Sequence, residues 1–104
     1  MAELKVIWTE TAVLQRNLIF EYWNNRNRNN SYSKKLRIAI KERIHLLKQN
    51  PEMGKQTDFK KIRIIIFERY SILYKVEKEK IFIVSLWDNR QNPNKLLHLL
   101  RENK

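Results

Sequence analysis

The spacing of apolar and polar positions predicts a short strand followed by a helix at the start of the chain. Residues 4–8 form a β-prone run, and Thr9 after it is a favourable helix N-cap. Apolar residues then recur at helical spacing, which predicts a helix over residues 10–24. The apolar positions that define this helix are Leu14, Leu18, Ile19, Tyr22 and Trp23.

A second helix is expected after a short polar connector. Residues 24–30 contain only Asn and Arg, and Asn favours turns. Ser31 is placed to cap the next helix, and Pro51 predicts its end because the residue before a proline is pushed out of helical geometry. The apolar positions of this second helix are Tyr32, Leu36, Ala39, Ile40, Ile44 and Leu47. The two segments together predict an antiparallel helix hairpin.

Three β-rich runs follow in the last third of the chain. They cover residues 62–66, 70–76 and 81–87, and the charged segment 77–80 between the last two is expected to be an exposed turn. In the first run, alternation assigns one face to Ile62, Ile64 and Ile66. The residues assigned to its other face are Lys61, Arg63 and Ile65. We expect this second face to present positive charge outward.

The last run is apolar at both its odd and its even positions, which predicts a central strand. Asn92 then has the position of an N-cap, with Pro93 as the first residue of a short C-terminal helix. The expected order is β-α-α-β-β-β-α. The sequence therefore predicts a single α+β domain over residues 1–104, with the helix hairpin packed on a small curved, mainly antiparallel sheet.

Charge is the compositional feature that most narrows the choice of partner. The net charge is +11, and residues 26–63 carry 12 Lys and Arg against 3 Asp and Glu. Such a concentration favours an anionic partner, either nucleic acid or an acidic protein. The chain has no cysteine and one glycine, which excludes thiol chemistry and Gly-rich phosphate loops. No run is long and apolar enough for a membrane span, so we expect a cytoplasmic protein.

Several short motifs recur in an order that resembles a known group of proteins. They are Trp8-Thr9 with Ala12, Asn50-Pro51-Glu52-Met53-Gly54, Ile62-Arg63, Tyr70-Ser71-Ile72-Leu73-Tyr74 and Asp88-Asn89-Arg90-Gln91-Asn92-Pro93. This order resembles the RelE/ParE superfamily of toxins from type II toxin–antitoxin (plasmid stabilisation) modules. The resemblance implies a growth-arresting toxin neutralised by a cognate antitoxin. We expect that antitoxin to be acidic and partly disordered, with a homodimer or a toxin–antitoxin heterotetramer as possible assemblies.

The superfamily includes two mechanisms, and the residues needed for each differ. RelE-like members are ribosome-dependent mRNA endonucleases, and ParE-like members poison DNA gyrase. Metal-free RNA cleavage needs a base, an acid and cations for the phosphorane charge. The resemblance implies that Arg63 is a phosphate-contacting residue and that Arg90 lies near the place of a second such arginine. Lys60 and Lys61, just before Arg63, complete a group of cations that could contact nucleic acid or another partner.

Candidates for the acid and the base are few. His98 lies on a leucine-rich segment, where a histidine is more often a packing residue, and Asp88 is as typical of a turn as of a general base. Trp87 is either a core residue, which we favour, or a partner-binding anchor. We expect no metal site and no cofactor, because the histidines and carboxylates are dispersed.

The lack of an acid–base pair favours the ParE-like mechanism. Two alternatives stay open: a RelE-like, metal-independent endoribonuclease, and a basic nucleic-acid-binding module without toxicity.

Overall fold

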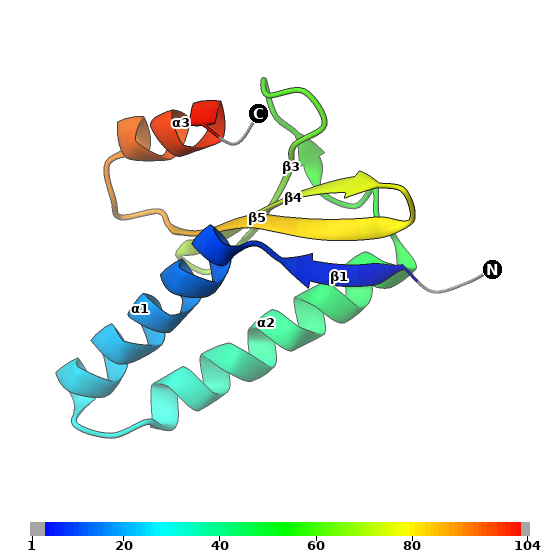
Figure 1. Cartoon of the computed structure of the whole chain (residues 1–104). Helices are drawn as coiled ribbons and strands as arrows, with labels where there is room; N and C mark the ends of the chain where they lie inside the picture. Colours follow the sequence, from blue (N-terminus) through cyan, green and yellow to red (C-terminus); the bar gives the residue numbers. More distant parts are fainter. Residues whose placement is uncertain (1–3, 103–104) are drawn as a thin grey trace.

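The computed structural model describes residues 4–102 and places a helix hairpin on one face of a mixed sheet and a short helix on the other (Figure 1). The sheet has five strands in the order β1-β5-β4-β3-β2, and only the β1–β5 pair is parallel. The elements are β1 Lys5–Trp8, α1 Glu10–Asn27, α2 Ser31–Gln49, β2 Lys55–Gln56, β3 Arg63–Phe67, β4 Tyr70–Glu77, β5 Lys80–Asp88 and α3 Pro93–Glu102. The predicted α+β fold is confirmed, with the two-residue strand β2 as an addition.

The hairpin differs from the prediction at its turn. Helix α1 begins after Thr9, whose Oγ1 accepts a hydrogen bond from the Ala12 amide, as expected for an N-cap. The helix does not stop at Asn24 but continues to Asn27, and Arg28 ends it in the left-handed region with φ 55°. One reason is that Asn24 is used by the hairpin, because its side-chain oxygen accepts a hydrogen bond from the Ser33 hydroxyl.

The start of α2 also differs from the prediction. Ser31 is the first residue of the helix rather than its cap, and Asn30 occupies the N-cap position without a side-chain capping bond. The Ser31 amide instead donates to the side-chain oxygen of Asn29 at 3.0 Å. The polar connector is therefore shorter than expected, because its Asn and Arg residues extend α1.

The apolar side chains of α1 divide into two sides, which the sequence did not separate. Ile19 and Trp23 lie in the core, as expected. Leu14, Leu18 and Tyr22 keep 61%, 55% and 45% of their surface exposed. The sheet and α2 cover only one side of α1, and residues four apart on the other side stay in solvent. We name the exposed row Leu14, Leu18 and Tyr22 the α1 strip.

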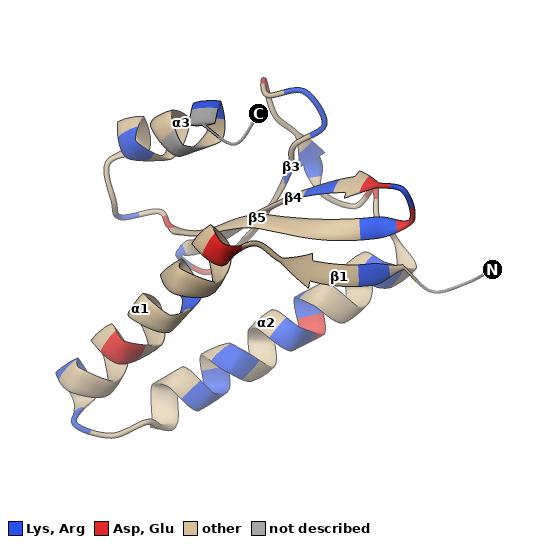
Figure 2. Ribbon diagram, viewed as in Figure 1, with Lys and Arg blue, Asp and Glu red and all other residues tan. Residues whose placement is uncertain are grey.

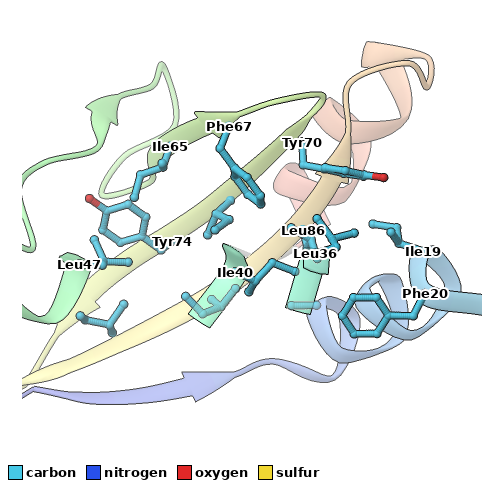
Figure 3. Close-up of a cluster of buried hydrophobic side chains, with 14 of the residues drawn as sticks. Ile19, Phe20, Leu36, Ile40, Leu47, Ile65, Phe67, Tyr70, Tyr74 and Leu86 are labelled. Atoms are coloured by element: carbon cyan, nitrogen blue, oxygen red, sulfur yellow. The ribbon is translucent and has the colours of Figure 1, made fainter. Parts of the chain in front are cut away.

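Strand β3 contributes to two separate cores. Ile65 and Phe67 lie in the core beneath the hairpin, together with Tyr70 and Tyr74 of β4 (Figure 3). Both tyrosines are fully buried. The opposite face of the sheet supports α3 over a smaller cluster made of Ile62, Leu73, Val84, Trp87 and Leu100.

The expectation of an open cationic face on β3 is wrong. Arg63 shares its face with Ile65 and Phe67, which is the face that the helix hairpin covers. Lys61 precedes the strand in a turn, with φ 68°. The alternation was assigned correctly, but the sequence could not say which face the hairpin would cover. Ile66, on the opposite face, is 65% exposed.

The expected central strand, charged turn and C-terminal helix of this half of the chain are confirmed. Strand β5 lies inside the sheet between β1 and β4. Lys78 and Glu79 form the exposed turn before it, both with positive φ, as a tight hairpin turn requires. Asn92 caps α3 by accepting a hydrogen bond from the Asn94 amide at 2.9 Å. Among the described residues, no helix is both long and apolar enough to cross a membrane.

Candidate functional site

The two arginines that the sequence singled out lie apart on the sheet. Arg63 pairs with Tyr74 in the middle of β4, whereas Asp88, which precedes Arg90 by two residues, pairs with Tyr70 at the start of β4. Four residues of strand separate the two pairs, a distance of about 13 Å. Arg63 and Arg90 are therefore not brought together around one phosphate group.

Arg63 braces the loop that follows α2. Its Nη1 donates hydrogen bonds to the carbonyl oxygens of Gly54 at 2.7 Å and Glu52 at 3.2 Å. Tyr74 supports the same loop, since its hydroxyl donates to the Pro51 carbonyl at 2.8 Å and accepts from the Gly54 amide at 2.9 Å. Burial raises the pKa of Tyr74, which keeps its hydroxyl protonated. These bonds give Arg63 a structural part in the fold.

Gly54 is required where it stands in this loop. A Cβ atom at this position would lie 2.5 Å from the Tyr74 hydroxyl oxygen, closer than van der Waals contact allows. The aromatic ring thus packs directly against the backbone, and any side chain at Gly54 would displace it.

Lys60 and Lys61 are exposed in the turn before β3. The Lys61 ammonium lies 3.6 Å from the Glu77 carboxylate, a surface ion pair of small energetic value. The two lysines border a shallow hollow of about 430 Å³ beside Leu100 of α3. They are available to a partner, but not as part of a site with Arg90.

A tightly bonded group of side chains occupies the end of β5. Asp88 accepts hydrogen bonds from the Arg90 amide at 2.9 Å, from its Nε at 3.0 Å, and from its Nη2 at 2.6 Å. The guanidinium of Arg90 also lies over the rings of Tyr22 and Trp23, at 5.7 and 5.4 Å from their centroids. Arg69 approaches the Trp23 ring as well, at 5.3 Å.

These bonds decide the protonation states in the group. Burial alone would raise the pKa of Asp88, but the hydrogen bonds and charge of Arg90, helped by Arg69, outweigh it and lower that pKa. The bond to Asp88 raises the pKa of Arg90 further above its ordinary value. Burial raises the pKa of Tyr70, whose hydroxyl oxygen accepts from Trp23 Nε1 at 2.6 Å. Asp88 is a paired carboxylate at neutral pH and is poorly suited to act as a base.

A groove of about 500 Å³ lies beside this group, between α1 and the end of β5. Leu18 and Tyr22 of the α1 strip form one side of it, and Trp87, Arg90 and Gln91 form the other. Here an exposed apolar row meets an arginine that is already held in position. The sequence contained the signal for this surface, because the three strip residues recur every four positions, but the same spacing also suits a buried helix face.

Trp87 and His98 lie on the side of the sheet that carries α3. Trp87 is 5% exposed and belongs to the smaller core, which agrees with the favoured interpretation. His98 is exposed on α3, so the expectation that it packs in the core is wrong. Both border a shallow hollow of about 520 Å³. Among the side chains that the structure describes, no group of three or more His, Cys, Asp or Glu could hold a metal ion.

Comparison with known proteins decides the family. The model of the family described as ParE toxin of type II toxin-antitoxin system, parDE, matches residues 6–93. The chain belongs to this family. It is a toxin of a type II toxin–antitoxin module.

A solved structure agrees with the fold of this ParE family member. The chromosomal ParDE TA system from P. aeruginosa matches with a TM-score of 0.70 and 19% sequence identity. The match covers 81% of this chain and 94% of that one. None of the curated proteins matches the chain.

Proposed function

We propose that this toxin inhibits DNA gyrase by binding to it, and that it uses the α1 strip and Arg90 to do so. The observation that carries the proposal is the arrangement of side chains at the end of β5. Its ionisable groups are held by internal hydrogen bonds, whereas the apolar row beside them is exposed. Such a surface is suited to contact with a protein rather than to proton transfer.

The composition of this surface supports a protein partner. Tyr and Arg are among the residue types that contribute most to protein–protein binding, and here Arg90 lies against the ring of Tyr22. The strip from Leu14 to Tyr22 covers nine residues of helix, a rise of about 12 Å. An exposed apolar row of this length, next to a groove, is typical of an interaction surface.

The geometry gives less support to cleavage of RNA. The two candidate phosphate-binding arginines lie at levels of β4 that are four residues apart, and Arg63 already donates to two carbonyl groups. Asp88 is a paired carboxylate whose pKa is lowered, so it is a weak base.

The antitoxin would neutralise the toxin by covering the same surface. A chain with a net charge of +11 attracts an acidic segment of a partner. If that segment is amphipathic, its apolar side can pack on the α1 strip. We place both the target and this partner in the cytoplasm.

Leu18→Asp tests the proposal. Leu18 is 55% exposed, so the substitution should leave the fold intact while placing a charge in the middle of the strip. We expect inhibition of gyrase supercoiling in vitro to weaken at least about tenfold. A tenfold loss of affinity corresponds to about 1.4 kcal/mol, which is typical of an interface residue that contributes strongly to binding. Growth arrest on expression without antitoxin should weaken in parallel.

Leu46→Asp is the matched control. Leu46 is an exposed leucine on α2, with 45% of its surface in solvent, and lies outside the groove. We expect this variant to inhibit gyrase as the wild type does. Equal inhibition by wild type and Leu18→Asp would contradict the proposed surface. Unaffected gyrase together with cleaved translated mRNA would contradict the proposed target.

A further inference from the structure

A second groove lies on the other side of α1, between α1, α2 and β1. It has a volume of about 360 Å³, and Trp8 and Phe20 are among its apolar residues. Its basic side chains are Arg16, Arg37, Lys41, His45 and Lys48. Among the described residues that line it, none is an Asp or a Glu. We name it the cationic groove.

The arginines of this groove rest on aromatic rings instead of carboxylates. The Arg16 guanidinium lies 4.8 Å from the centroid of the Trp8 ring, and that of Arg37 lies 4.6 Å from the Phe20 ring. Among the side chains that the structure describes, no carboxylate forms an ion pair with Arg16, Arg37 or Lys41. These three positive charges therefore lie in one groove with apolar walls, where a bound anion would offset their repulsion.

Arg16 shows most clearly that the charge is uncompensated. Its Nε is shielded from solvent and has no hydrogen-bond partner among the described residues. Most buried polar atoms in proteins have a hydrogen-bond partner, so this nitrogen lowers the stability of the protein when nothing is bound in the groove. An anion held in the groove would stabilise the guanidinium through its charge.

The groove continues into a longer row of basic residues on α2. Figure 2 shows Lys and Arg at several places along the length of this helix. Five basic positions fall within one narrow stripe, because they follow each other at intervals of three or four residues. They are Lys34, Arg37, Lys41, His45 and Lys48. The stripe is about 21 Å long, which corresponds to about six nucleotides of one strand.

We propose that the cationic groove and the α2 stripe bind the phosphates of a nucleic-acid backbone. The spacing of the charges in a row suits a linear polyanion. The guanidinium groups cover the aromatic rings, so the groove leaves those rings unavailable for stacking bases. Binding is therefore independent of sequence and is dominated by phosphate contacts.

An acidic peptide fits the same groove less well. Peptide partners gain most of their affinity from apolar anchors in pockets, and here Arg16 and Arg37 lie over the aromatic rings that would form such a pocket. The apolar row of the molecule is the α1 strip, and Leu18 lies about 160° around the helix from Arg16 and Phe20. The two sides of α1 thus offer an apolar surface for protein and a cationic one for phosphate.

A DNA-binding measurement tests the proposal. A labelled DNA duplex of mixed sequence is titrated with the full chain, and its fluorescence anisotropy is measured over a range of NaCl concentrations. Arg37→Gln/Lys41→Gln removes two charges from the groove. We expect the slope of log K against log salt to become less steep by about 1.8, because each phosphate contact contributes about 0.9. We also expect at least about tenfold weaker binding at low salt.

Lys35→Gln/Lys78→Gln is the matched control. Both lysines are exposed and lie outside the groove, and the double substitution removes two positive charges, as the groove variant does. We expect it to bind DNA within about twofold of wild type, with an unchanged slope. An equal loss in the two double variants would overturn the proposal, because the net charge alone would then explain binding. Polyglutamate that binds more tightly than DNA, and only when Arg37 and Lys41 are present, would assign the groove to an acidic protein instead.

A further variant separates the groove from folding and from the proposed target. Arg16→Met keeps an unbranched side chain over Trp8 and removes the charge, so we expect weaker DNA binding with an unchanged circular dichroism spectrum. Unchanged DNA binding by a folded Arg16→Met protein would exclude Arg16 from the site. Leu18→Asp should bind DNA as the wild type does, so the failure of one proposal can be told from the failure of the other.

Discussion

Arginines at the end of β5 and in the cationic groove have the same chemistry but opposite surroundings. Arg90 donates hydrogen bonds to Asp88 from its amide, its Nε and its Nη2. Arg16 and Arg37 lie over aromatic rings and have no carboxylate partner among the described residues. The first arginine is part of a local structural unit, whereas the other two keep their charge available. A net charge of +11 thus combines cations that stabilise the fold with cations that can recruit an anion.

The difference arises from how each charge meets its neighbours. Asp88 and Arg90 are two residues apart, so a turn at the end of a strand is enough to join them. Arg16 and Arg37 come from different helices, and they meet beside Trp8 of β1 only when the hairpin packs on the sheet. Pairs of the first kind form with the turn itself, whereas a groove of the second kind exists only in the completed fold.

Removing the paired carboxylate should give the largest change in stability. Asp88→Ala leaves the Arg90 guanidinium next to Tyr22 and Trp23 without its acceptor, and also removes the acceptor of the Arg90 amide. We expect the free energy of unfolding to fall by about 1–2 kcal/mol, the lower part of the range for charged hydrogen bonds, since the Arg90 side chain is 46% exposed. Urea unfolding measures this change.

Two comparisons define the result for Asp88. Asp58→Ala, at an exposed aspartate in the loop before β3, should change stability by less than about 0.5 kcal/mol. Arg90→Ala in the Asp88→Ala background should cost little more, because the two residues act as one unit. Equal and small effects of Asp88→Ala and Asp58→Ala would show that the pair contributes nothing to the fold.

The sequence was enough to predict the fold because its signals are local. Thr9 and Asn92 cap their helices, Pro51 follows the end of α2, and the run that is apolar on both faces forms the interior strand β5. The errors lie where local signals compete. The segment after Asn24 was polar enough for a turn, yet it extends α1 in solvent as far as Asn27.

The candidate site was less predictable, because it depends on which faces are covered. Arg63 was assigned to the correct face of β3, but the hairpin covers that face, and the guanidinium donates to the Gly54 carbonyl. Leu14 and Leu18 have the spacing of core residues and lie in solvent. The basic residues of α2 follow helical spacing, but the cationic groove also needs residues of α1 and β1, and spacing alone could not bring the three elements together.

The pH dependence of stability should show whether Asp88 is held as a carboxylate paired with Arg90. Hydrogen bonds and charge from Arg90 outweigh burial and lower the pKa of Asp88 in the folded state. The stabilisation from Asp88 is therefore present above its unfolded pKa of about 3.9 and is lost as pH falls through the lower, folded pKa. We expect the difference in unfolding free energy between wild type and Asp88→Asn to be greatest near pH 7 and to shrink below about pH 4.

A matched pair of variants checks this assignment. Asp58→Asn, measured over the same range of pH, should track the wild type closely, because Asp58 is exposed in a loop and forms none of the ion pairs described. A difference between wild type and Asp88→Asn that stays constant from pH 7 to pH 3 would mean that Asp88 is not held as a paired carboxylate.

The smallest expected effect belongs to the cationic groove, and its sign is opposite. Lys41 has no carboxylate partner among the described side chains and lies in one groove with Arg16 and Arg37. Lys41→Gln should therefore relieve repulsion and raise stability by a few tenths of a kcal/mol at low salt. The gain should disappear near 1 M NaCl, where charges are screened within about 3 Å. Lys78→Gln, in a turn between Glu77 and Glu79, should instead lower stability slightly or leave it unchanged. Thermal unfolding of both variants at low and high salt measures the contrast, and a gain of equal size in both would show that Lys41 responds only to the overall charge of the chain.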